Sequence, residues 1–273
     1  MAADLHIHTT FSDGTASPEK VVELSKKAGL KTIAITDHDT VDGIEPALKA
    51  GGGIGLEVIP GIEFTAEIAE AEIHILGYFI DYSLPELTLT LKKIQEDRIS
   101  RIYKICQKLS NLKVMVDPQK ILALAGHGSP GRPHVARILK EEGYVSGVKE
   151  AFDKYLDFRA PAYVAHYRLT PSEAIKLIIS SKGIAVFAHP ATSNCDQIIP
   201  ELIVAGLAGI EAYYPGHDER DIRHYLSLAK KLGLLVTGGS DYHGDGSFRE
   251  VKLGEISISD ELVERLREAK DKV

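Results

Sequence analysis

Short apolar runs alternate with amphipathic stretches over much of the chain. Residues 31–36 are almost continuously apolar, as expected for a strand buried on both faces of a parallel sheet. Before them, Ser17, Pro18 and Glu19 supply a helix N-cap, a first-turn proline and a first-turn acid. Further strands are expected over 3–8, 56–63, 72–79, 183–188, 209–214 and 234–238, and further helices over 171–181 and 218–232. This repetition predicts an α/β fold with a mostly parallel sheet.

Two departures from this rhythm shape the expected fold. The strands at 56–63 and 72–79 are too close in sequence for a crossover helix, so the pair is either antiparallel or irregularly joined. Residues 85–157 read as a long helix over 85–109 followed by shorter helical pieces at 119–124, 134–141 and 147–155. We interpret 85–157 as a small helical insertion domain, and 1–84 with 158–273 as one discontinuous barrel domain.

Histidines and carboxylates gather where the predicted apolar strands end. His6 and His8 are two residues apart on a strand, so their side chains point to the same face. The other members follow strand ends or lie close to them: Asp13, His38, Glu63, His74, His189, Asp241 and His243. In α/β barrels this rim is where catalytic groups collect.

Imidazole nitrogens together with carboxylate oxygens favour Mn²⁺, Zn²⁺ or Fe²⁺ over Mg²⁺. Nine candidate ligands exceed the needs of one ion, so two or three divalent ions are expected. Such a centre suits phosphate ester hydrolysis, because several ions can neutralise phosphate oxygens and stabilise a leaving alkoxide.

A blander interpretation exists for each of these residues. A single histidine at a strand end is usually a hydrogen-bonded loop residue, and Asp37 either caps the next helix or supports a ligand from behind. Six of the eleven histidines fall on one predicted rim, which favours the metal site. His127, His166 and His224 have no strand-end context and are expected to be ordinary surface or helix residues.

Composition narrows the possible partners. Hydrophobic residues make up 44% and charged residues 26% of the 273 positions, as in ordinary globular proteins. No apolar run is long enough to span a membrane, and the protein is not expected to bind a membrane. A net charge of −7 argues against duplex DNA, although bound cations would reverse the local sign at a site. Two cysteines, Cys106 and Cys195, make no disulfide framework, and Met1 leads directly into a strand, so a cytoplasmic location is expected.

The motifs together resemble one family. The relevant segments are His6-Ile7-His8 with Asp13, Thr36-Asp37-His38-Asp39, Gly61-Ile62-Glu63, His74, Ala188-His189-Pro190 and Gly239-Ser240-Asp241-Tyr242-His243. This combination is similar to that of the PHP (polymerase and histidinol phosphatase) family. The resemblance implies a distorted (β/α)7 barrel and three ions. It assigns His6, His8, Glu63 and Asp241 to the first ion, Glu63, His74 and His189 to the second, and Asp13, His38 and His243 to the third.

The insertion resembles one branch of that family. The segment from Gly131 to Arg137 is similar to one in PHP phosphoesterases that act on nucleoside 3′,5′-bisphosphates and on short RNA from the 5′ end. This implies that the insertion covers the active site and that Arg132 and His134 contact substrate phosphate, since a guanidinium suits bidentate phosphate binding. The alternative is a turn with a solvated Arg132.

Three further residues are candidates for the substrate pocket. Arg98 and Arg101 share one side of the long helix, where they either assist phosphate binding or form a solvated charged face. His217 lies just beyond a strand end and is expected to line the substrate pocket.

The expected mechanism is attack on phosphorus by a hydroxide that bridges two ions. Asp13, His38 and His243 are the expected catalytic residues, with His243 or the third ion assisting the departing ribose hydroxyl. The expected substrate is a small phosphorylated nucleotide or short single-stranded RNA, and no obligate protein partner is evident.

Three rival functions remain. A histidinol phosphatase of the same family should lack the segment from Gly131 to Arg137. An amidohydrolase would leave Asp13 and Asp241 to His243 unexplained. A non-catalytic metal-binding module should have lost ligands, and none is missing.

Overall fold

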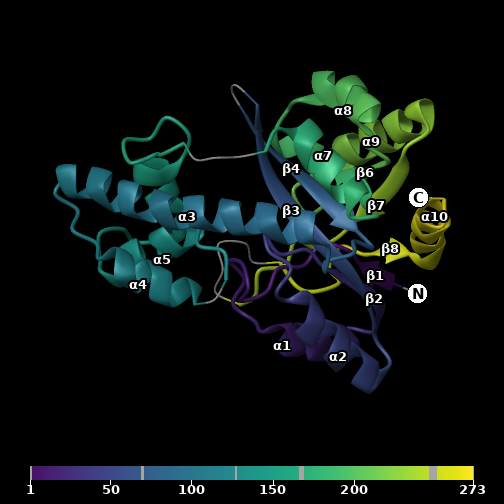
Figure 1. Cartoon of the computed structure of the whole chain (residues 1–273), viewed down its shortest axis with the longest axis horizontal. Helices are drawn as coiled ribbons and strands as arrows, with labels where there is room; N and C mark the ends of the chain where they lie inside the picture. The colour runs from purple at the N-terminus through teal and green to yellow at the C-terminus, as the bar shows by residue number, and fades with distance from the viewer. Residues whose placement is uncertain (1, 69–70, 127, 166–168, 246–250, 273) are drawn as a thin grey trace.

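The computed structural model describes residues 2–68, 71–126, 128–165, 169–245 and 251–272. They form a curved sheet flanked by helices, from which a helical part extends to one side (Figure 1). His127 and His166, expected to be ordinary residues, lie outside the described ranges. Among the described residues, no helix has the length and apolar character of a bilayer-spanning segment.

The sheet contains eight strands in the order β7-β6-β5-β4-β3-β2-β1-β8. Their bounds are Ala2–Asp4 (β1), Leu30–Ile35 (β2), Glu57–Ile68 (β3), Ala71–Tyr78 (β4), Ile184–Phe187 (β5), Gly209–Tyr213 (β6), Leu235–Gly238 (β7) and Ile258–Ser259 (β8). Strand β4 runs antiparallel to both β3 and β5, and β8 is antiparallel to β1. The remaining pairs are parallel. Of the two arrangements left open for the third and fourth strands, the antiparallel pair is the one observed.

The segment after β1 closes the sheet into a barrel. Leu5 N donates to Gly238 O at 3.2 Å, and His8 N donates to Tyr242 O at 2.9 Å. The first strand is shorter than the expected 3–8, because β1 ends at Asp4. The residues after it bond to Gly238 at the end of β7, to Tyr242 beyond it and to Thr36 after β2. The expected distorted (β/α)7 barrel is confirmed, with β8 as an added short strand.

Helices cover the outside of this barrel. They are Pro18–Lys27 (α1), Ile44–Ile54 (α2), Pro171–Ser180 (α7), Ile199–Ala205 (α8), Glu219–Leu232 (α9) and Asp260–Lys270 (α10), with 3-10 turns at Pro190–Thr192 and Asp196–Ile198. Helix α1 starts as predicted, since Ser17 Oγ accepts from Lys20 N at 3.3 Å. No range was predicted for α2, α8 or α10.

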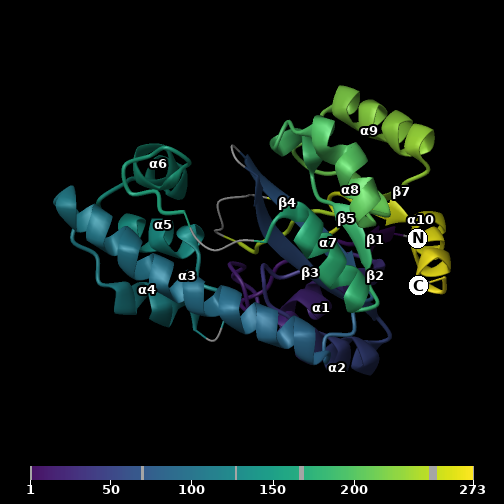
Figure 2. The same ribbon diagram turned by 45° about the horizontal axis from the view of Figure 1, so that its top comes forward.

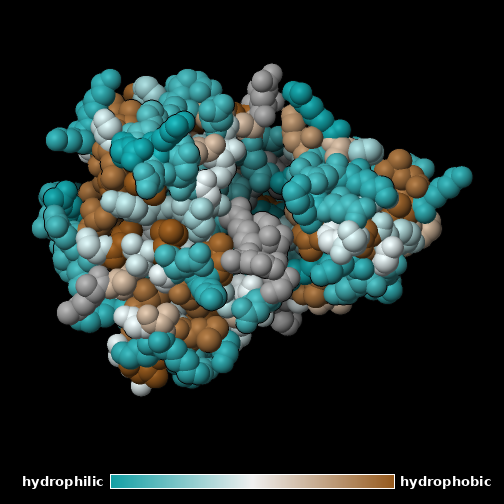
Figure 3. Space-filling model, turned by 180° about the vertical axis from the view of Figure 1, so that it is seen from behind, coloured by the Kyte–Doolittle hydropathy of each residue, from teal (hydrophilic) through white to brown (hydrophobic). Residues whose placement is uncertain are grey.

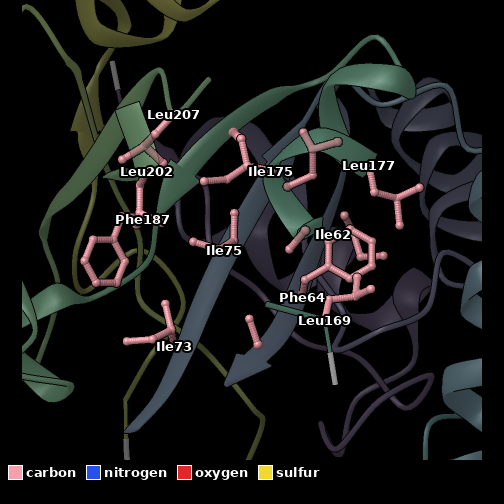
Figure 4. Packing of buried hydrophobic residues seen from close by; sticks show 14 of the residues in the cluster. Ile62, Phe64, Ile73, Ile75, Leu169, Ile175, Leu177, Phe187, Leu202 and Leu207 are labelled. Atoms are coloured by element: carbon pink, nitrogen blue, oxygen red, sulfur yellow. The ribbon is translucent and has the colours of Figure 1, made fainter. Parts of the chain in front are cut away.

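The largest hydrophobic cluster lies between the sheet and α7. Ile62, Phe64 and Ile75 of the β3–β4 pair face Ile175 of α7, and Phe187 extends the cluster along β5 (Figure 4). A separate cluster includes Leu5, Leu76 and Val186, and α10 contributes Val263 and Leu266 to it. These clusters hold the strand ends that carry the candidate site in fixed register.

The helical part has its own hydrophobic cluster. Its elements are Pro85–Asn111 (α3), Pro118–Ala125 (α4), Arg132–Glu141 (α5), Val148–Ala151 (α6) and a π-helical turn over Phe152–Leu156. Ile102, Ile105 and Leu109 of α3 belong to this cluster. The first turns of the same helix contribute Leu87 and Leu91 to the barrel cluster instead. One helix therefore runs from the barrel to the far end of the helical part (Figure 2), and the division at residues 84 and 85 stays a prediction.

Candidate metal centre

Glu63 is the centre of the candidate site. This residue lies in β3 with 1% of its surface exposed. Five ring nitrogens lie 2.8–3.3 Å from its two carboxylate oxygens, and they belong to His6, His8, His38, His74 and His189. Because β4 runs antiparallel to β3, His74 reaches Glu63 from within a strand rather than from a strand end.

The remaining predicted ligands adjoin this group. Asp241 Oδ1 lies 3.1 Å from His8 Nε2 and 3.5 Å from His6 Nε2. Asp13 Oδ1 lies 3.2 Å from His243 Nε2. The structure thus brings all nine predicted side chains together, and their role as ligands stays a prediction.

Within the described part of the chain, three groups of side chains have donor atoms that lie within 4.8 Å of one another. The first is His6, His8, Glu63 and Asp241, the set expected for one ion. The second is the expected set of Asp13, His38 and His243 with His8 added. The third combines His38, Glu63 and His74. His189, which was expected on the second ion with Glu63 and His74, is not part of this group, although its Nε2 lies 3.1 Å from Glu63 Oε1.

The donor atoms fit a divalent cation. His6 Nε2, His8 Nε2, Asp13 Oδ1 and Glu63 Oε2 are buried, and the contacts of 3.1–3.3 Å that they make within the cluster do not have hydrogen-bond geometry. Leaving buried polar atoms unsatisfied costs free energy. Mixed imidazole and carboxylate donors are those that Zn²⁺, Mn²⁺ and Fe²⁺ accept, so the cluster is compatible with metal binding.

The backbone is unusual at three positions of the site. Asp39, His189 and Asp241 have φ values of 51°, 28° and 51°, in the left-handed region that disfavours residues with a Cβ. Such conformations persist where the surrounding structure over-determines them, often at functional sites. A Cβ at Gly239 would collide with the backbone nitrogen of His6, so only glycine lets the segment after β7 pass this close to the first histidine.

Glu211 contacts two candidate ligands, and the sequence analysis missed it. It is fully buried in β6, and its Oε1 lies 3.0 Å from His6 Nδ1 while its Oε2 accepts from His189 N at 2.9 Å. This contact leaves His6 Nε2 facing Glu63, an arrangement typical of metal-binding histidines. Burial alone would lower the pKa of His6, but the carboxylates of Glu211 and Glu63 outweigh it and raise that pKa to about 10. The sequence did offer one signal of this role, because Glu211 is the single acid in an otherwise apolar strand.

Asp37 supports the loop that carries Asp13. Its carboxylate accepts from Thr9 N and Thr9 Oγ1, both at 2.7 Å, and from Ser12 Oγ at 2.5 Å. Ser12 Oγ lies 3.3 Å from His8 Nδ1. The helix-capping interpretation of Asp37 is wrong, because the next helix, α2, begins after Gly43.

Asp4 supports the segment after β7 in the same way as Asp37 supports the loop of Asp13. Its carboxylate accepts from Ser240 N at 2.8 Å, Ser240 Oγ at 2.6 Å and Gly254 N at 3.0 Å. Burial raises the pKa of Asp4 to about 6, against the opposing effect of these hydrogen bonds. The bonds to Ser240 fix the residue next to Asp241, and the sequence analysis did not identify this role.

The candidate ligands form one wall of a cavity of about 180 Å³. The candidate ligands that line it are Asp13, His38, Glu63, His74, Asp241 and His243. His6, His8 and His189 are buried and do not line it. The opposite wall comes from α3, α5 and the π-helical turn, through Arg98, Arg101, Arg132 and Phe152. From behind, the surface is hollowed between the barrel and the helical part (Figure 3).

Arg98 and Arg101 are buried in the cavity wall, with 7% and 4% of their surfaces exposed. Arg98 pairs with Asp39 and donates to Thr65 Oγ1 at 3.2 Å. Arg101 Nε donates to Val164 O at 2.7 Å. The interpretation of these two arginines as a solvated charged face is therefore wrong.

Arg132 also faces the cavity. Its Nη2 lies 2.9 Å from Glu72 Oε2, and Glu72 Oε1 lies 3.2 Å from His74 Nε2. Its guanidinium carbon lies 5.8 Å from the ring centre of Phe152. Only Glu72 thus separates the positive charge of Arg132 from the candidate ligand His74.

Two of the expected substrate contacts lie outside the cavity lining. His134 is 2% exposed, and its Nδ1 accepts from Gly131 N at 3.2 Å at the start of α5. Burial lowers the pKa of His134 to about 4. His217 is 7% exposed, with Nδ1 2.9 Å from Ala212 O. Direct contact of either histidine with substrate stays a prediction. His224 pairs with Asp196 on the surface, as expected of an ordinary residue.

Residues 4–162 match the family model of the PHP domain, which is more than half of the chain. The chain belongs to the PHP family. The expected resemblance and the expected enzyme class, a metal-dependent phosphoric ester hydrolase, are thereby confirmed.

Three curated relatives match along most of their length. A phosphoribosyl 1,2-cyclic phosphate 1,2-diphosphodiesterase from Eggerthella lenta is 30% identical, over 89% of this chain and 95% of the relative. A 3′,5′-nucleoside bisphosphate phosphatase from Chromobacterium violaceum is 29% identical, over 89% and 87%. The 5′-3′ exoribonuclease Rnm from Escherichia coli is 34% identical, over 88% and 84%.

Two solved structures have the same fold throughout. A Bifidobacterium adolescentis protein described as a metal-dependent phosphoesterase superposes with a TM-score of 0.90 at 30% identity, covering 97% of this chain and 94% of its own. A Chromobacterium violaceum protein described as an amidohydrolase, with bound sulfate and no metal, gives 0.89 at 28% identity, covering 98% and 96%.

Proposed function

We propose that the protein hydrolyses phosphate esters of nucleotides: 3′,5′-nucleoside bisphosphates to nucleoside 5′-monophosphates, short RNA from its 5′ end, or both. The observation that carries this proposal is the composition of one cavity. A cluster of histidines and carboxylates around Glu63 forms one wall, and Arg98, Arg101 and Arg132 contribute to the opposite wall. Cations on one side and guanidinium groups on the other suit a doubly charged phosphate ester.

The nine clustered residues would hold two or three ions of Mn²⁺, Zn²⁺ or Fe²⁺. When bound, these ions neutralise phosphate oxygens and lower the pKa of water. Three overlapping donor groups support more than one ion. Glu211, Asp37 and Asp4 would hold the ligands in position from behind.

His243 is proposed to give a proton to the departing ribose hydroxyl in the state with two ions, in which its Nε2 holds no metal. Its Nδ1 lies 2.8 Å from the backbone carbonyl of Asp241, so this nitrogen carries one hydrogen, and the proton that moves is the one on Nε2, which lies 3.2 Å from Asp13 Oδ1. Both residues line the cavity, as does His38. Asp13, His38 and His243 are therefore the proposed catalytic residues.

The proposed substrate class is a phosphate ester of ribose. The three relatives carry names that refer to a phosphoribosyl cyclic phosphate, a nucleoside bisphosphate and RNA, and each contains a ribose phosphate ester. We also propose that residues 85–157 act as the cover of the active site, because this part supplies the arginine-bearing wall. The two buried free thiols, Cys106 and Cys195, support a reducing location such as the cytoplasm.

The test is release of phosphate or mononucleotides from four compounds in the presence of Mn²⁺: adenosine 3′,5′-bisphosphate, a short 5′-phosphorylated RNA, AMP and histidinol phosphate. We expect turnover of the bisphosphate or the RNA to exceed that of histidinol phosphate. We expect Arg132→Ala to reduce kcat/KM for the preferred substrate by about 10- to 100-fold, since charged hydrogen bonds contribute roughly 1.5–3 kcal/mol.

Arg223→Ala is the matched control, because Arg223 is exposed on α9 and pairs only locally with Glu219 among the described contacts. It should retain wild-type turnover. Preference for histidinol phosphate, or equal behaviour of the two arginine variants, would overturn the substrate assignment.

A further inference from the structure

A second cavity adjoins the candidate metal centre. It has a volume of about 290 Å³ and shares Glu72 and Arg132 with the first cavity. The two cavities therefore meet at the Arg132–Glu72 ion pair. The rest of its lining is Glu67, Ala71, Asp157, Phe158 and Tyr163, none of which the proposed reaction uses.

The second cavity presents aromatic surface to a ligand. Phe158 is 46% exposed, although burying such a ring is strongly favourable. Tyr163 packs against it edge to face, with ring centres 5.4 Å apart and planes at 77°. The next residue, Arg159, has a left-handed φ of 70°, and its guanidinium lies 5.3 Å from the Phe158 ring centre. Left-handed residues of this kind cluster at ligand sites, and this one directly follows the exposed ring.

The polar groups around these rings are mainly hydrogen-bond acceptors. Glu67, Glu72 and Asp157 contribute carboxylates, and the Tyr163 hydroxyl lies 3.5 Å from Glu67 Oε1. Carboxylates in this setting accept from amino groups and repel a further phosphate. The cavity thus combines ring stacking with acceptors, which suits a flat heterocycle that bears exocyclic amino groups.

We propose that this second cavity binds the nucleobase of the substrate, with Phe158 as its stacking residue. The proposal rests on the proposed function, because it requires the phosphate of the same molecule to lie in the first cavity. Arg132, which belongs to both cavities, would then lie beside the sugar and phosphate between the two ends. The base site selects nucleotides over other small phosphate esters, while the chemistry stays with the residues around Glu63.

The test compares two ligands that differ only by the base, AMP and ribose 5-phosphate. Their affinities for the full chain loaded with Mn²⁺ are measured by calorimetry for the wild type, Phe158→Ala, Phe158→Tyr and Val204→Ala. Val204 is the control for loss of an exposed apolar side chain, since it lies on α8 with 89% of its surface exposed. Stacking of one base strengthens binding by roughly 5- to 100-fold.

We expect the wild type to bind AMP at least fivefold more tightly than ribose 5-phosphate. Phe158→Ala should remove most of that difference while leaving ribose 5-phosphate affinity within twofold, and Phe158→Tyr should retain it. Equal affinities in the wild type, or equal weakening of both ligands in Phe158→Ala, would overturn the base site. Failure of the proposed hydrolysis would show instead as absent turnover of every ester, with the difference between the two ligands intact.

Discussion

His134 should make the stability of this protein sensitive to mild acid. Its Nδ1 accepts the Gly131 N–H, so the ring is held neutral with its hydrogen on Nε2. Protonation would set two N–H groups against each other in a buried site. The folded-state pKa is about 4, against an ordinary value of 6.5, so the unfolded chain takes up the proton first. The stabilising contribution is therefore complete above about pH 6.5 and is lost as pH falls toward 4.

The magnitude follows from the shift. At 1.36 kcal/mol per pKa unit, the full loss is about 3 kcal/mol, of which about 2 kcal/mol has been lost at pH 5. His134→Asn tests this value, because the asparagine oxygen can accept the Gly131 N–H but does not titrate. We expect the variant to be less stable at pH 7.5 and to lose about 2 kcal/mol less than the wild type between pH 7.5 and 5.

The assay is urea unfolding of chelator-treated protein at several pH values. All other titrating groups are shared, so they cancel in the difference between wild type and variant. His224→Asn, at an exposed histidine, serves as the control and should keep the wild-type fall in stability. Parallel curves for the wild type and His134→Asn would refute the reasoning, because burial would then not control this ring.

Two further predictions concern the supports of the site, and a third concerns a buried thiol of the helical part. Glu211→Gln should weaken Mn²⁺ binding about 10- to 100-fold while the fold is kept, because it removes the carboxylate that orients His6; calorimetric titration checks this, and unchanged affinity would rule the role out. Arg98→Met should cost about 3–5 kcal/mol in urea unfolding, since it leaves the buried Asp39 carboxylate without its partner; a loss below about 1 kcal/mol would contradict it. Burial raises the pKa of the Cys106 thiol to about 11, so it should react with a thiol reagent at pH 8 far more slowly than in urea; equal rates would show that the thiol is accessible.

Much of the site could be predicted because it follows strand ends. Asp241 and His38 each lie a few residues after a strand, β7 or β2, has ended, and the barrel brings those ends to one rim. His74 could be named but not placed from periodicity, since it lies within β4 and reaches Glu63 only because that strand is reversed. The roles of Asp4 and Glu211 were missed because neighbouring residues in sequence do not reveal which distant residue a buried acid will contact.

The errors in the fold have a similar cause. The segment of residues 5–8 has strand-like composition, but Leu5 and His8 donate to Gly238 at the end of β7 and to Tyr242 beyond it, a pairing set by barrel closure across more than two hundred residues. The burial of Arg98 and Arg101 is another long-range effect. Their helical face looks solvated in sequence, yet it packs against Asp39 and Val164. Tertiary contacts of this kind cannot be read from local patterns.

Helix α3 has a consequence for cooperativity. Leu87 and Leu91 lie in the barrel cluster and Ile102 and Ile105 in the second cluster, and the backbone between them is one uninterrupted helix. Loss of either cluster would expose apolar residues of a helix that the other still holds, so partial unfolding is penalised. The two halves of the substrate cavity should therefore melt in a single calorimetric transition, and the distance between them should be set by a rigid rod rather than by a hinge.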